Sequence, residues 1–142
     1  MEFPWEAPLS GAEELTALLE DSGVVYERTG DRFRFLFSSQ GCKWQTVCDC
    51  AGDRVLIYGI HPVPVADRAA ALEAADALNR QAVEGGCFVA EGRLVFRTGA
   101  RLLEPVAARE TLARALEYNA AVMTAFWSRL AEGAEGPWKS CP

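Results

Sequence analysis

The fold is decided by residues 33–60, which read FRFLFSSQGCKWQTVCDCAGDRVLIYGI. In this stretch large apolar side chains recur at every second position, as Phe33, Phe35 and Phe37 do. A period of two is typical of strands that bury one face. Short glycine-containing links at 38–41 and 51–53 separate the runs, and links this short join antiparallel neighbours. The stretch therefore predicts an antiparallel meander, which a short strand at 24–28 extends.

Three helical segments and a second hairpin surround this meander. A capping box formed by Ser10 and Glu13 begins a helix over 11–22. A second helix over 65–84 follows the proline-rich turn 61–64, and Gly85-Gly86 ends it. A hairpin over 87–98 then precedes the longest helix, predicted over 106–132, whose apolar residues form one stripe.

The order of these segments predicts the fold class. Helix, three or four strands, helix, two strands and helix form an α+β domain, in which an antiparallel sheet is flanked by helices. We expect a single domain over 1–142 with its core at about 10–132. The termini, 1–8 and 133–142, are expected to be mobile or strapped onto the domain. Their aromatic residues would dock either on this chain or on a partner; they are Phe3, Trp5 and Trp138.

Composition excludes several classes of partner. The formal net charge is −6 and the pI is about 4.8, and no run of Lys or Arg offsets this charge, so we expect no nucleic-acid binding. No apolar stretch is long enough for a membrane helix, and the first residues do not form a secretory signal. Five cysteines, an odd number, favour reduced thiols and a cytoplasmic location.

Several local strings resemble the YbjN family of bacterial proteins. They lie at 44–53, 61–64, 68–80, 86–89 and 92–97, and the resemblance covers about residues 12–131. It implies a fold similar to that of the type III secretion chaperones, which are small, acidic, usually dimeric and non-enzymatic. Members of the family are described as regulators of sensory transduction. Because fold alone does not carry function, these properties are expectations for this chain.

Few residues suggest reaction chemistry. Cys48 and Cys50 lie two apart on a predicted strand and so point to one face, where they form either buried small side chains or a metal or redox pair. Zinc commonly needs four ligands, and only this one close pair occurs. The single histidine, His61, has no neighbouring nucleophile motif and is expected to be a turn residue. We therefore expect no enzyme activity and no cofactor.

Two asparagines have a predicted structural role. Asn79 and Asn119 fall on the apolar arcs of their helices. A buried amide without hydrogen bonds costs about 1 to 3 kcal/mol. We therefore expect each side chain to hold a neighbouring loop or strand backbone, with ligand binding as the alternative.

These observations favour a non-enzymatic protein-binding module, either chaperone-like or regulatory, that acts as a homodimer. Its partners would be another polypeptide and a second copy of itself, because the apolar helix and sheet faces exceed the needs of one small core. The predicted contact residues are Phe33, Phe35, Trp44, Met123 and Trp127. The alternative is a small-ligand or metal/redox sensor that uses the strand face bearing Cys48 and Cys50.

Overall fold

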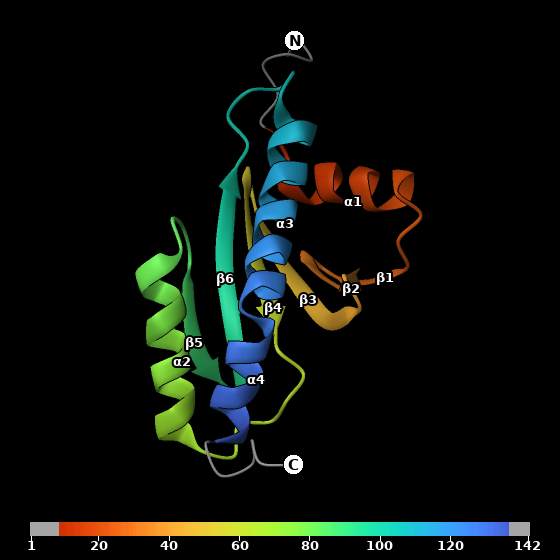
Figure 1. The fold of residues 1–142 in the computed structure, drawn as a ribbon. Helices are drawn as coiled ribbons and strands as arrows, with labels where there is room; N and C mark the ends of the chain where they lie inside the picture. The colour runs from red at the N-terminus through yellow and green to blue at the C-terminus, as the bar shows by residue number, and fades with distance from the viewer. Residues whose placement is uncertain (1–8, 137–142) are drawn as a thin grey trace, which may run out of the picture.

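The computed structural model describes residues 9–136, so Phe3, Trp5 and Trp138 lie outside the described residues. Within this range the chain forms four helices and one six-stranded sheet, an α+β fold as predicted (Figure 1). The elements are α1 (Gly11–Asp21), β1 (Tyr26–Thr29), β2 (Arg32–Ser39), β3 (Cys42–Ala51), β4 (Arg54–Ile60), α2 (Arg68–Gln81), β5 (Gly86–Ala90), β6 (Arg93–Arg101), α3 (Ala108–Ala125) and α4 (Trp127–Glu135).

The sheet is antiparallel throughout, with the strand order β1-β2-β3-β4-β6-β5. The predicted meander is thus confirmed as β1 to β4. The turn between β2 and β3 has a positive φ at Gln40 and Gly41, and the turn between β5 and β6 has one at Glu91 and Gly92. Two successive residues with positive φ suit the twist of a tight hairpin. Both turns fix the register of their strands.

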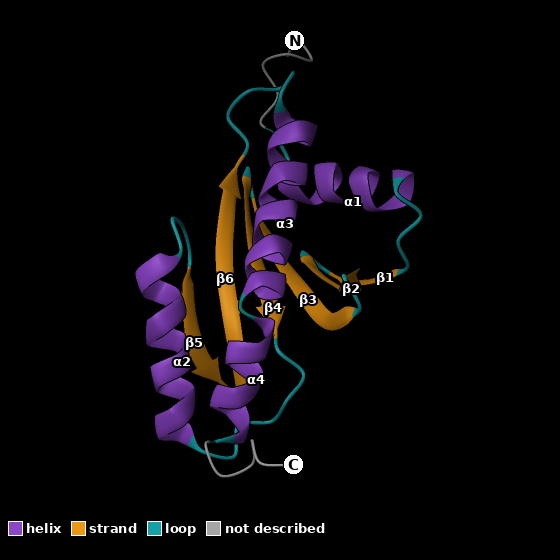
Figure 2. Cartoon of the chain, in the orientation of Figure 1, coloured by secondary structure: helices purple, strands orange, loops and turns teal. Residues whose placement is uncertain are grey.

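All four helices cover the same face of the sheet (Figure 2). The helix α3 runs along β4 and β6, α1 crosses near one end of the sheet, and α2 lies beside α4 at the other end. Their contact is close: a Cβ added to Gly133 in α4 would lie 2.4 Å from the Cβ of Ala74 in α2. Within residues 9–136, no helix lies on the opposite face of the sheet.

The core consists of two clusters that meet along α3. One joins α1 and the first half of α3 to the sheet through residues such as Leu15, Phe33 and Ile57. The other joins α2, α4 and the second half of α3 through residues such as Trp44 and Phe96. Burial of this apolar surface provides the main driving force for folding.

Several helix boundaries differ from those expected from the sequence, among them the end of the second helix at Gln81 and the start of the long helix at Ala108. The second helix begins at Arg68 rather than at 65, because the Asp67 side chain accepts a hydrogen bond from the Ala70 amide and caps it there. The expected helix over 106–132 is interrupted at Phe126 and forms α3 and α4. Residues 133–136, expected in the terminal tail, belong to the fold instead, since Ala134 is completely buried.

The buried amide of Asn119 ties α3 to the centre of the sheet. Its Nδ2 donates to the carbonyl oxygens of Ile57 and Phe96, each at 3.2 Å, and to Oγ1 of Thr98 at 3.0 Å. These three acceptors lie on β4 and β6. The helix can approach because Gly59 has no side chain: a Cβ there would lie 2.8 Å from Oδ1 of Asn119. The partners are strand groups, in agreement with the structural role predicted for this residue.

We predict that Asn119→Leu lowers the free energy of unfolding by about 1 to 3 kcal/mol, because the apolar side chain leaves buried acceptors without their donor. Urea denaturation followed by circular dichroism measures this change. Thr111→Leu is the matched control, since Thr111 lies exposed on the same helix, and we expect it to change stability by about 0.5 kcal/mol or less. Equal stability of Asn119→Leu and the unmodified chain would contradict the structural role.

Candidate functional site

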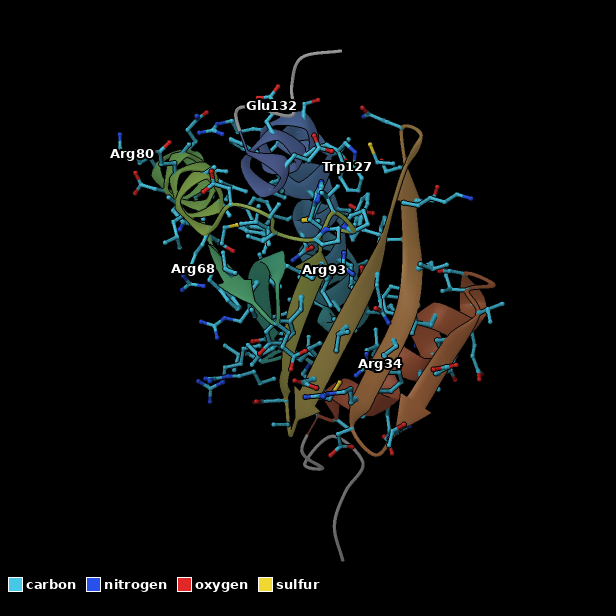
Figure 3. The ribbon with its side chains drawn as sticks, turned by 90° about the horizontal axis from the view of Figure 1, so that it is seen from below. Arg34, Arg68, Arg80, Arg93, Trp127 and Glu132 are labelled. Carbon is cyan, nitrogen blue, oxygen red and sulfur yellow. The ribbon has the colours of Figure 1, made fainter. Side chains whose placement is uncertain are left out.

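Four of the five contact residues predicted from the sequence are inside the fold. Phe33 and Met123 are completely buried, and Phe35 and Trp44 are 6% and 1% exposed. Phe33, Phe35 and Trp44 face the chain's own helices, and Met123 of α3 packs against the sheet. The expectation of a partner surface is therefore corrected for Phe33, Trp44 and Met123, whereas Phe35 also lines an open groove described below. Trp127 is half-buried at the start of α4, where its ring lies 5.6 Å from that of Trp44. Figure 3 shows Trp127 on the helical side.

The cysteine pair lies in the core rather than at a surface. Cys48 is completely buried and Cys50 is 7% exposed, and both point toward the helices. Burial raises the pKa of the Cys48 thiol far above its usual value and raises the pKa of Cys50 to about 11. Both are therefore thiols at neutral pH, whereas a metal or an oxidant reacts with a thiolate. Among residues 9–136, no three His, Cys, Asp or Glu side chains are placed to share a metal ion.

His61 is completely buried where β4 ends, which the turn assignment did not predict. Its Nδ1 accepts a hydrogen bond from the Val63 amide at 3.3 Å, and its ring lies 4.4 Å from that of Trp127. Within the described part of the chain, Nε2 has no hydrogen-bond partner. Burial lowers the pKa of His61 to about 4, so the imidazole is neutral at pH 7.

Asn79 fastens the edge strand β5 to α2. Its Nδ2 donates to the Cys87 carbonyl oxygen at 3.0 Å, and its Oδ1 accepts from the Cys87 amide at 2.7 Å. One side chain thus satisfies both backbone groups of a single residue. These are the backbone contacts that the sequence predicts for this amide, although Asn79 itself lies at the exposed margin of the helix.

One open surface is an apolar groove beside β2. The strand β1 pairs with β2 only from Arg32 to Phe35, whereas β3 pairs with β2 as far as Ser39. The backbone edge of β2 over 36–39 is therefore free within the described residues. Beside it lies a groove of about 300 Å³ between α1, β2 and α3. It is lined mainly by apolar residues, among them Leu18, Val24, Phe35, Phe37, Ala113 and Leu116.

A second open surface is the face of the sheet that no helix covers, which we call the open face. Strand register places seven cationic side chains on it but only two carboxylates, Glu27 and Asp49. Half of the 14 Lys and Arg residues of an acidic chain therefore lie on one face. Figure 3 shows Arg34 and Arg93 on strands. The seven are Arg32, Arg34, Lys43, Arg54, Arg93, Arg97 and Arg101.

Among the described residues, several of these cations form no ion pair. Arg32 is engaged by Asp49, with Nε–Oδ1 and Nη2–Oδ2 distances of 2.7 and 3.2 Å. No salt bridge within residues 9–136 involves Arg34 or Arg97, and both are exposed. The guanidinium of Arg97 lies over the ring of Phe88 at 5.7 Å. The open face thus combines available positive charge with aromatic surface.

Comparison with known proteins identifies the fold but not a family. No family model matches the chain, and no curated protein matches it. Among solved structures it is similar to that described as "YbjN, a putative transcription regulator from E. coli". The TM-score is 0.59 at 15% sequence identity, and the match covers 91% of this chain and 96% of the other. The chain therefore has a YbjN-like fold. Within residues 9–136 no helix has both the length and the apolar character needed to cross a bilayer.

We predict that His61 makes stability depend on pH between about 6.5 and 4. The unfolded chain takes up a proton at this side chain near pH 6.5, and the folded chain only near pH 4, so acidification favours unfolding. Between pH 7 and 4.5 this group alone removes about 2 to 3 kcal/mol from the free energy of unfolding. Urea denaturation at each pH measures the loss.

The control for this prediction is His61→Asn, which keeps an acceptor near the Val63 amide but does not titrate. Carboxylates contribute equally to both proteins, so the difference between the two pH profiles isolates the imidazole. We expect the variant to lose about 2 to 3 kcal/mol less over this range. Parallel profiles would disprove the assignment.

Proposed function

We propose that this protein is a non-enzymatic regulatory module that binds polypeptide along the free edge of β2. The observation that carries the proposal is the early end of β1, which leaves the β2 backbone over 36–39 unpaired on one side beside an apolar groove. An extended segment that pairs with this edge forms main-chain hydrogen bonds, and its alternate side chains enter the groove.

The groove has the composition of a binding surface for apolar side chains. Phe37 and Glu117 line both this groove and a neighbouring hollow farther along α3, so the apolar surface continues along the helix. Small side chains border the extension, including Ala120, Ala121 and Ala125. Small residues leave room for the side chains of a partner.

We propose a second copy of the chain as the first partner. Two β2 edges related by a two-fold axis can run antiparallel and join two sheets into one, and an isologous contact of this kind closes as a dimer. A free strand edge is also a hazard for uncontrolled association, which such a closed dimer prevents. The regulatory assignment is supported by the description of the structural neighbour as a regulator.

We predict that the unmodified chain is a dimer at micromolar concentration and that Ala113→Arg is a monomer. The arginine side chain would extend from α3 into the groove, which Ala113 lines. Light scattering over a dilution series measures the mass.

The matched control is Thr111→Arg, which introduces the same residue on the same helix in an exposed position that lines a different hollow. We expect this variant to remain a dimer. Circular dichroism must show that both variants fold. A monomeric unmodified chain at every concentration would defeat the homodimer proposal.

A further inference from the structure

The open face carries an apolar row that crosses five strands. Register places Leu36 beside Gln45, then Ile60, Val95 and Phe88 in turn, so that a line from β2 to β5 contains one polar member. Leu36 is 71% exposed, Ile60 and Phe88 are half-buried, and Val95 between them is 5% exposed. Neighbouring strands lie about 4.8 Å apart, so the row is about 19 Å long.

Cations flank this row on both sides. Lys43 and Arg93 lie two residues from the row in one direction along the strands. Arg34 and Arg97 lie two residues from the row in the other direction. Since each residue advances a strand by about 3.3 Å, the two flanking rows are about 13 Å apart. An α-helix with its side chains is about 10 to 12 Å wide, and about 13 helical residues span 19 Å. The dimensions therefore match one helix laid across the strands.

We propose that the open face binds an acidic amphipathic helix of a partner protein. Its apolar stripe would lie on the row from Leu36 to Phe88, and Asp or Glu residues on both sides of that stripe would reach the flanking cations. Tyr58, half-buried between Arg34 and Arg97 in the flanking row, adds an aromatic contact. Aromatic and arginine side chains are the residues that most often dominate binding energy at protein interfaces.

Charge argues against other occupants of this face. Two open faces brought together would place like charges opposite one another, which disfavours a face-to-face dimer. The rim also carries carboxylates, Asp31, Asp53 and Glu91, which would repel the continuous phosphate backbone of a nucleic acid. A short acidic helix can place its carboxylates next to the cations alone and so avoid the carboxylates of the rim. The proposal shares Leu36 with the groove beside β2, but its cations and the other residues of its row lie outside that groove.

The test measures binding of a fluorescent synthetic helix of about 15 residues by anisotropy. One side of the helix carries leucine, and both margins of that stripe carry glutamate. Two control peptides replace its glutamates by lysine or its leucines by alanine. We expect micromolar affinity for the acidic amphipathic helix, weakened by added salt, and at least about tenfold weaker binding of either control, since tenfold corresponds to about 1.4 kcal/mol.

Protein variants locate the contact. We expect the double variant Arg34→Glu and Arg97→Glu to reduce affinity at least about tenfold and Leu36→Ser to reduce it about threefold. The matched control replaces Arg80 and Arg114, exposed arginines on α2 and α3, by glutamate. We expect it to change the affinity for the peptide less than twofold. We also expect Ala113→Arg to bind like the unmodified chain, which separates this test from that of the dimer.

Several results would overturn the proposal. The proposal fails if the acidic peptide does not bind at about 100 µM or if the lysine peptide binds equally well. It also fails if charge reversal at Arg80 and Arg114 weakens binding as much as charge reversal at Arg34 and Arg97. Tighter binding of a single-stranded oligonucleotide would assign the face to nucleic acid. If deletion of residues 1–8 raised the affinity for the peptide about tenfold, the open face would be assigned to that segment of the chain. If the protein formed head-to-tail polymers at high concentration, and the Arg34 and Arg97 charge reversals abolished them, the open face would bind the helical side of a second copy instead.

Discussion

The contact between α3 and the strand β4 at Gly59 is the constraint on which the remaining packing depends. A side chain at Gly59 would collide with Asn119 and Met123, so the helix could not lie this close to the sheet. The Asn119 amide then bonds to groups on β4 and β6, the two strands that join the meander to the second hairpin. With α3 held along this line, α1 packs on one side of it and α2 with α4 on the other.

Within the described residues every helix lies on one face of the sheet, so none of them covers the other face. Acidic side chains are concentrated on the helices and basic side chains on the open face, which the composition alone does not reveal. The helices carry ten Asp and Glu residues and five Arg residues, whereas seven cations and two carboxylates occupy the strand positions of the open face. A net charge of −6 therefore conceals the positive open face. An argument from net charge excludes a partner only when the charges are evenly mixed.

Much of the fold was predictable because its signals are local. Alternation gave the strands, short glycine-containing links gave their antiparallel pairing, and the Ser10 cap gave the start of α1. The break at Phe126 was not predictable, since neither glycine nor proline marks it. Phe33, Trp44 and Met123 were misplaced for a different reason: periodicity shows which side of a strand or helix is apolar, but not that another part of the same chain covers that side. The flanked apolar row takes one residue from each of five strands, so its pattern exists only once the register is known.

The pairing of β4 with β6 has a consequence for how quickly the chain can fold. It joins Ile60 to Val95 and Arg54 to Arg101, across the whole of α2 and β5, whereas every other strand pair is a hairpin between sequence neighbours. Hairpins form within microseconds, but a long loop must lose entropy before its ends gain contacts. The meander and the β5–β6 hairpin can therefore assemble early and separately. We expect the pairing of β4 with β6, which joins these two parts, to limit the rate of folding.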